Sequence, residues 1–173
     1  MSELEEAWAV ALAEAETRAR TAGRKDLVAY LALRKSNDLL RMIGINWLST
    51  TFKSLAGEAN RKGAGIQIAK DDSHRFRVGN ATMVGSLLTL SSGVRKLSME
   101  AGWPRTPGDG FVRGGGLACG NIKHLGIKSA TESLLLVLSD QGVPQWIVRK
   151  RSSQSEVHEA TLRNHIAILL ATR

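Results

Sequence analysis

Cysteine is almost missing from this sequence, which holds a single one, Cys119, among 173 residues. One cysteine cannot form a disulfide within the chain, and it argues against a zinc site built on several thiolates. A low cysteine content is typical of proteins kept in a reducing compartment. We therefore expect a cytoplasmic protein.

Long hydrophobic runs are missing as well. The longest uninterrupted aliphatic run extends from Leu134 to Leu138, far below the ~20 residues that a helix needs to cross a bilayer. The first residues, MSELEEAW, are acidic and lack the positive segment and apolar run of a signal peptide. These absences predict a soluble intracellular protein with no membrane span.

The sequence contains no complete catalytic or cofactor-binding motif. Gly115 and Gly120 have the G-x-x-x-x-G spacing of a phosphate loop, but Asn121 stands where the phosphate-binding lysine belongs. A dinucleotide-binding G-x-G-x-x-G fails at Cys119, and H-E-x-x-H, G-x-S-x-G and S-x-x-K do not occur. The sequence predicts no cofactor and no metal site, and it favours a protein without enzymatic activity.

The composition that remains is that of one globular domain, with 43% hydrophobic and 23% charged residues. The net charge of +8 is unevenly placed, because residues 1–60 carry eight basic and eight acidic side chains. The whole excess lies in residues 61–173, which carry sixteen basic and eight acidic residues. Such a field attracts nucleic acid, anionic lipid or acidic protein, the alternative being a solvated basic surface without a ligand.

The helical period covers the start of the chain, residues 1–62. Apolar spacing predicts an amphipathic helix over residues 2–22, ended by Gly23. A second helix is expected from Asp26, as its N-cap, toward residue 60. Gly44 and Asn46 interrupt its apolar stripe, so it is either one kinked helix or two. This helical hairpin either packs on the protein's own sheet or pairs between subunits.

From residue 63 the period changes from 3.6 to 2, which indicates strands up to residue 152. Connections between successive strands are short, so the strands pair antiparallel. We expect an α+β fold with a largely antiparallel sheet of about six strands and a C-terminal helix within residues 153–173. The expected strands are 66–68 and 74–78 around a KDDS turn, then 82–90, 94–101, 132–139 and 143–151, with Ser153 or Ser155 capping the last helix.

The stretch 101–126 collects the unusual residues. It contains eight of the seventeen glycines, two of the three prolines and the only cysteine. Glycines let backbone N–H groups turn toward an anion, and Arg113 precedes three of them. The alternative is that the glycines let strands cross closely at a corner of the sheet. The predicted ligand-binding residues are Arg113, Gly114, Gly115, Gly116, Cys119, Lys123 and His124.

Cys119 and His124 also raise the question of covalent catalysis. A thiol and an imidazole form a nucleophilic pair when folding brings them within ~3 Å, with a third group such as Asp109 orienting the base. A lone cysteine in an apolar context is more often a small buried side chain. We therefore predict no catalytic residue.

Basic residues alternate with apolar ones along several expected strands. If these polar faces coincide, the sheet presents a row of cations that contacts phosphates in a salt-dependent manner. Charge on a polar strand face also serves simply to discourage aggregation. Trp103 is the loop aromatic expected to stack on a base. The predicted nucleic-acid-binding residues are Arg75, Arg77, Lys96, Arg149, Lys150 and Arg151.

Taken together, the sequence favours an intracellular non-enzymatic binding protein whose basic sheet and Gly-rich stretch engage nucleic acid or another polyanion. One alternative is a module for a small molecule or phosphate ligand, including an enzyme, centred on residues 113–124. Another is an assembly protein that forms a homo-oligomer through its N-terminal helices.

Overall fold

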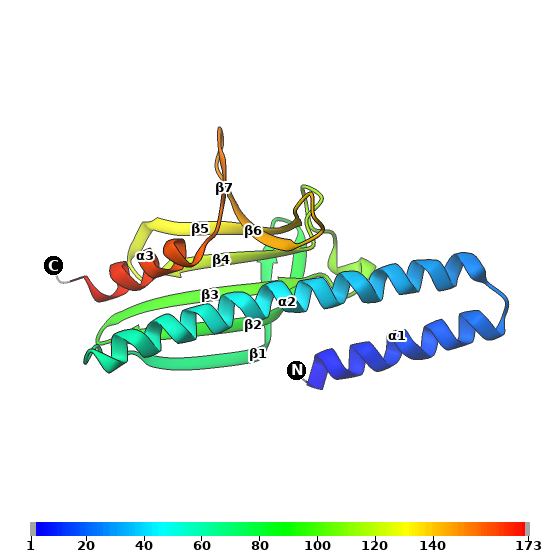
Figure 1. Ribbon diagram of the computed structural model, residues 1–173, viewed down its shortest axis with the longest axis horizontal. Coiled ribbons are helices and arrows are strands. Elements are labelled where there is room, and N and C mark those ends of the chain that lie inside the picture. The colour runs from blue at the N-terminus through cyan, green and yellow to red at the C-terminus, as the bar shows by residue number, and fades with distance from the viewer. Residues whose placement is uncertain (1–2, 172–173) are drawn as a thin grey trace.

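The computed structural model describes residues 3–171. Within that range three α-helices flank an antiparallel sheet whose seven strands lie in chain order (Figure 1). The α+β prediction is confirmed, with one strand more than expected. The helices are α1 (Glu3–Thr21), α2 (Lys25–Arg61) and α3 (Glu159–Leu170), and a short 3-10 helix η1 spans Pro107–Asp109. The strands are β1 (Gln67–Val78), β2 (Ala81–Ser92), β3 (Arg95–Trp103), β4 (Ala118–His124), β5 (Ile127–Leu138), β6 (Pro144–Arg149) and β7 (Gln154–Glu156).

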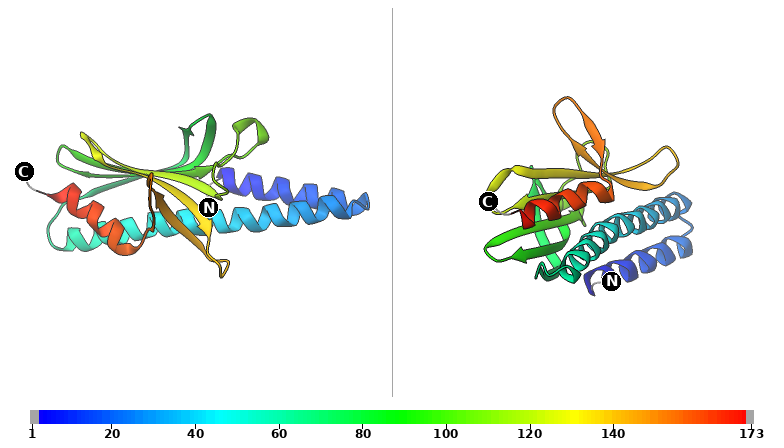
Figure 2. Two further views of the ribbon diagram at one scale, coloured as in Figure 1. Left: turned by 90° about the horizontal axis from the view of Figure 1, so that it is seen from above. Right: turned by 60° about the vertical axis from the view of Figure 1, so that its left-hand side comes forward.

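The α1–α2 hairpin extends beyond the sheet (Figures 1 and 2). α1 packs on α2 through a small apolar cluster of Leu12, Ala19 and Leu31. The two helices are also joined by a hydrogen bond of 2.6 Å that Trp8 Nε1 donates to the buried Asp38. Only the C-terminal half of α2 contributes to the core under the sheet. The expected packing of the hairpin on its own sheet therefore holds for that half of α2.

α2 is one continuous helix through Gly44 and Asn46. Gly44 faces the sheet, where a Cβ would lie 2.7 Å from a methyl group of Leu136. Its carbonyl oxygen accepts a hydrogen bond of 2.8 Å from Trp146 Nε1. Glycine therefore serves close approach of the helix to the sheet, and the alternative of two separate helices is wrong.

The main core lies between the sheet and the helices α2 and α3. α2 contributes Leu48 and Phe52, both fully buried, and α3 contributes Leu162. Burying apolar side chains of this size stabilises the fold by about 2 kcal/mol each. The strand residues of this core are Leu88, Leu90, Leu97, Met99, Ala101, Trp103, Ala118, Ile122, Leu134, Leu136, Trp146 and Val148.

The sheet bends sharply where Gly85 of β2 pairs with Gly102 of β3. A Cβ on Gly85 would overlap the carbonyl oxygen of Ala101, so the two strands approach too closely for any other residue. The bend turns the end of the β1–β2 hairpin away from the helices (Figure 2, left). There Phe76 and Met83 build a second core with Cys119, Leu135 and Ile147 on the opposite face of the sheet.

Several expected element boundaries are wrong. The KDDS segment at 70–73 is not a turn, because β1 runs through it and takes up a bulge between Asp71 and His74. β4 lies inside the Gly-rich stretch, where glycines hide the alternation of a strand. β7 was also missed, since a strand of three exposed residues leaves no apolar pattern.

Helix caps differ from those expected. Asp26 lies in the first turn of α2, which begins after Arg24. Ser153 and Ser155 do not cap α3, because the chain between them pairs with β6. α3 begins instead after His158, whose backbone N–H bonds to Thr161 Oγ1 at 3.2 Å.

Candidate functional site

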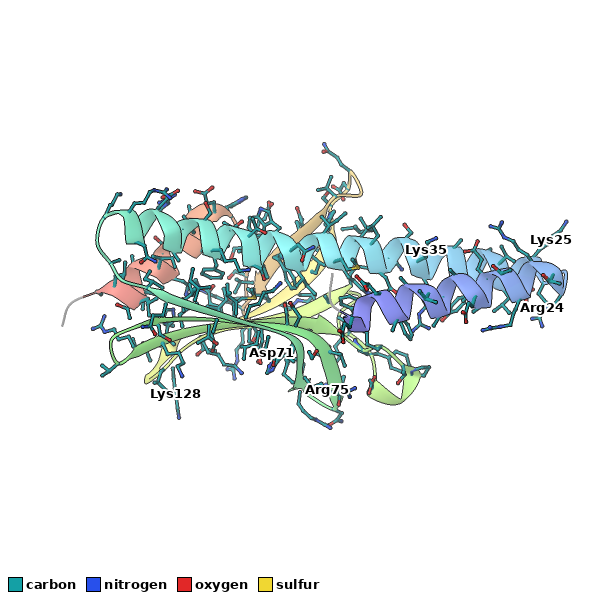
Figure 3. All side chains as sticks on the ribbon, turned by 90° about the horizontal axis from the view of Figure 1, so that it is seen from below. Arg24, Lys25, Lys35, Asp71, Arg75 and Lys128 are labelled. Carbon is teal, nitrogen blue, oxygen red and sulfur yellow. The ribbon has the colours of Figure 1, made fainter. Side chains whose placement is uncertain are left out.

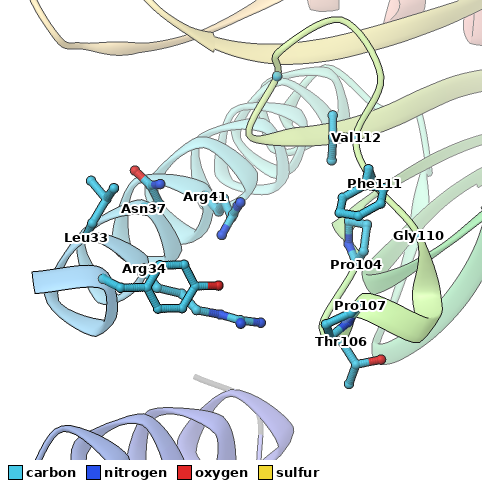
Figure 4. A pocket seen from close by; sticks show the side chains of 12 residues that line it. Leu33, Arg34, Asn37, Arg41, Pro104, Thr106, Pro107, Gly110, Phe111 and Val112 are labelled. Atoms are coloured by element: carbon cyan, nitrogen blue, oxygen red, sulfur yellow. The ribbon is translucent and has the colours of Figure 1, made fainter. Parts of the chain in front are cut away.

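The middle of the Gly-rich stretch is a loop, residues 104–117, held at both ends by α2. Arg34 Nη2 donates to the carbonyl oxygen of Arg105 at 2.8 Å, and Arg41 Nε donates to that of Leu117 at 2.7 Å. Arg105 is itself buried, with its guanidinium 3.4 Å from the centre of the Trp103 ring. Two arginines on one face of α2 therefore fix where this loop starts and ends (Figure 4).

The 104–117 loop separates two hollows. The helix-side hollow, of about 340 Å³, lies between α2 and the loop, with Arg34, Arg41 and Phe111 in its walls (Figure 4). The sheet-side hollow, of about 270 Å³, lies between the loop and the open face of the sheet. Phe111 lines both hollows, so it marks the ridge between them.

Arg113 and Arg149 line the sheet-side hollow together. Arg113 reaches the β1–β2 turn, its Cζ lying 3.9 Å from where a Cβ of Gly79 would be. The guanidinium of Arg149 lies against Gly114, so a side chain at that position would collide with it. Both arginines are exposed, and neither forms an ion pair with any residue in the described part of the chain.

Backbone conformation adds to this positive region. Gly114 and Gly115 both have φ in the left-handed region, at +82° and +74°. Backbone N–H groups in turns are one source of the anion-binding concavities that proteins form. Glycine adopts these φ values without the steric cost that a Cβ brings.

Two further cations continue from Arg149 along the chain. Lys150 and Arg151 form the turn between β6 and β7, closed by a hydrogen bond of 2.8 Å from Lys150 N to Ser153 O. This hairpin stands away from the sheet (Figure 1). Both side chains are exposed and form no ion pair within residues 3–171. Arg113, Arg149, Lys150 and Arg151 are called the basic cluster below.

Arg75, Arg77 and Lys96 do not join this cluster. Arg75 pairs with Val84, which pairs with Trp103, so Arg75 and Arg77 lie on the helix-facing side of the sheet, opposite to Arg149. Lys96 lies at the end of β3 remote from the 104–117 loop. The polar faces of the strands therefore do not coincide in one row of cations. Figure 3 shows Arg75 on β1.

Cys119 and His124 do not meet. Cys119 belongs to the second core, whereas His124 faces α3 and bonds to His165 through a distance of 2.9 Å between Nε2 and Nδ1. Burial raises the pKa of the Cys119 thiol, which disfavours the reactive thiolate. Asp109 accepts a hydrogen bond of 3.1 Å from Thr106 within the loop. The arrangement needed for a Cys–His nucleophile is therefore lacking.

Lys123 is neutralised by a polar network on the open face of the sheet. Its Nζ lies 2.7 Å from Glu100 Oε1, which also accepts a bond from Asn121 at 3.0 Å. The second oxygen of Glu100 lies 2.8 Å from His74 Nε2. Burial raises the pKa of Glu100, but the three hydrogen bonds together outweigh it and hold the pKa below its ordinary value. Lys123 thus serves Glu100 rather than an external anion.

The aromatic group at this site is Phe111, not Trp103. Trp103 is 1% exposed and covered by Arg105, so it cannot stack on a base. Phe111 is 80% exposed at the ridge between the hollows. Sequence reasoning missed it together with Arg34 and Arg41. The usable signal was a large aromatic residue inside a Gly- and Pro-rich loop, two positions before an arginine.

Comparison with family models, with curated proteins and with solved structures found no match to this chain. No helix within residues 3–171 is both long and apolar enough to cross a membrane. In the same range, no three His, Cys, Asp or Glu side chains are grouped so that they could hold a metal ion.

Proposed function

We propose that this protein binds a polyanion, nucleic acid foremost, through the basic cluster. The observation that carries the proposal is the convergence of Arg113 and Arg149 on one hollow beside the glycine turn. These two residues come from segments far apart in the chain. Their positive charges are not balanced by carboxylates of the described chain, and an anion would supply that balance.

The chemistry of the cluster suits phosphate. Arginine offers a planar fork of N–H donors that matches phosphate oxygens in a bidentate manner. Lys150 and Arg151 extend the positive region by one hairpin, which suits a ligand with several phosphates rather than one. Each phosphate neutralised on a single strand lowers the slope of log K against log salt by about 0.7.

Oligonucleotide binding measured by fluorescence anisotropy at several salt concentrations tests the proposal. Four phosphate contacts predict a slope near −3 for a single strand, which is a loss of affinity of roughly 50-fold between 50 and 200 mM salt. The double variant Arg113→Glu with Arg149→Glu should weaken binding at least about tenfold and flatten the slope.

A control with the same change in net charge is available in Lys35→Glu with Lys128→Glu. Both lysines are exposed and lie on other parts of the molecule (Figure 3). This control should keep most of the affinity, because local contacts rather than total charge carry the binding. An equal loss in both double variants, or a salt-independent affinity, would contradict the proposal.

A second candidate function is self-assembly through the α1–α2 hairpin, as the sequence also suggested. The observation that favours it is a set of exposed apolar side chains on a hairpin that extends beyond the sheet. Val10 is 57% exposed, Tyr30 55% and Leu33 62%. Surfaces of this kind are typical of contacts between proteins.

A further inference from the structure

Phe111 is exposed although the loop around it is firmly held. Gly110 packs against Ala81, whose Cβ lies 2.8 Å from where a Cβ of Gly110 would be. The loop ends are bonded to Arg34 and Arg41. An aromatic ring left 80% exposed on such a support loses the stabilisation that burial would give. The ring is therefore presented to solvent by the fold.

Cations lie on both sides of this ring. Arg113 follows it by two residues and lines the sheet-side hollow with Arg149. Arg34 lies across the helix-side hollow, beside Arg41, whose charge is paired with Asp38 (Figure 4). An aromatic face bordered by positive charge is the arrangement on which unpaired bases stack while their phosphates contact arginines.

We infer that the polyanion is single-stranded nucleic acid, with one unpaired base stacked on Phe111. The inference rests on the proposed function and adds the class of nucleic acid to it. Phosphates next to that base contact Arg113 and Arg149. A duplex lacks this contact, because its bases are already stacked on each other and their faces are closed to a side chain.

Selectivity for single strands is the measurable consequence. A labelled single strand and a duplex of the same length are titrated at one salt concentration, by anisotropy, with wild-type protein and with Phe111→Ala. We expect Phe111→Ala to weaken single-strand binding about 5- to 100-fold and to leave duplex binding within about twofold. Phe111→Tyr should restore single-strand binding, since it keeps the ring.

Stacking also has a direct optical signature. In Phe111→Trp the new indole fluorescence should be quenched when single-stranded DNA or RNA binds. The four native tryptophans are present in both proteins and provide the baseline.

Val94→Ala is the matched control for Phe111→Ala, because Val94 is 94% exposed in the β2–β3 turn, away from the loop. It should bind both ligands as the wild type does.

The outcomes separate this inference from the function on which it rests. Equal effects of Phe111→Ala on single strand and duplex, or none on either, would overturn the stacking inference. The proposed function would then still hold if the Arg113→Glu with Arg149→Glu variant loses salt-dependent binding. Absence of binding to both ligands by the wild-type protein would overturn the proposed function itself.

Discussion

The bend of the sheet requires a residue without a side chain at Gly85. It pairs with Gly102 at the bend of the sheet, and a Cβ would overlap a backbone oxygen that cannot rotate away. We predict that Gly85→Ala lowers the free energy of unfolding by about 3 kcal/mol or more. Urea denaturation followed by circular dichroism measures the change.

Gly57→Ala is the matched control within α2. Apart from its chain neighbours and the helix backbone, the nearest described atom to the added methyl group would be Arg61 Nη1, at an ordinary contact distance of 3.8 Å. Alanine is the better helix former, so this variant should be more stable by up to about 1 kcal/mol. An unchanged unfolding midpoint for Gly85→Ala would show that the bend does not depend on glycine.

At the residue scale, the charged residues could be recognised in the sequence, but the side chains that lie next to them in the folded protein could not. Arg113 and Arg149 belonged to two separate predicted sites, and only the folded sheet brings them to one hollow. Lys123 could not be recognised as a partner of Glu100, because that contact joins two strands at positions fixed by register. Exposure of Phe111 was equally hidden, since it depends on how the loop is held.

At the scale of elements, α3 is fixed to the sheet by a chain of hydrogen-bonding side chains. His124 of β4 bonds to His165 of α3, whose Nε2 lies 3.1 Å from Glu132 of β5. Burial, and then the neighbouring His165, lower the pKa of His124. Arg95 of β3 also approaches α3, donating to the carbonyl oxygen of Ile168 at 3.3 Å.

This arrangement predicts that stability falls in acid. The unfolded chain protonates His124 near its ordinary pKa of about 6.5, while the folded protein does so only at lower pH. The contribution of neutral His124 to the free energy of unfolding is therefore complete above about pH 6.5. It is lost as the pH falls toward the lowered pKa of His124 in the folded protein. One such group changes stability by at most about 1.4 kcal/mol per pH unit.

Urea denaturation of the wild type and of His124→Gln between pH 7.5 and 5 measures this contribution. The variant should be less stable at pH 7.5, and its stability should decline less steeply with falling pH. Comparing slopes removes the contribution of titrating groups that do not interact with position 124. Parallel slopes would contradict the assignment to His124.

Helices and strands in which apolar residues recur with a clear period could be predicted from the sequence, and those without such a period could not. α1 follows directly from its apolar spacing and from Gly23, which comes just after its end. β4 was not predicted because Gly120 and Asn121 interrupt the alternation of apolar and polar residues that indicates a strand. The contact that Gly44 of α2 makes with Trp146 joins residues 102 positions apart in the chain. Contacts of that range leave no local signal.

At the scale of the whole molecule, the α+β class could be predicted because the helical period of the apolar residues gives way to a strand period along the chain. The bend of the sheet and the second core could not be predicted in this way.

The protruding α1–α2 hairpin is the other feature of the whole molecule, and it predicts a homodimer. α1 starts with the exposed Glu3 and Glu6. At the other end of the hairpin lie Lys25, the first residue of α2, and Arg24, which is paired with Asp26 (Figure 3). Antiparallel pairing of two hairpins places each acidic start beside the end of the second copy's hairpin that carries Lys25, as a twofold contact requires.

Light scattering after size-exclusion chromatography tests the homodimer. We expect a mass of about twice the 18.7 kDa of the chain. Val10→Glu with Leu33→Glu should yield the monomer, because two carboxylates would replace apolar contacts at the interface. Val94→Glu, which adds charge at an exposed site outside the hairpin, should leave the dimer intact. A wild-type mass of one chain at micromolar concentration would contradict pairing, and the exposed apolar residues would then be a surface for a different partner.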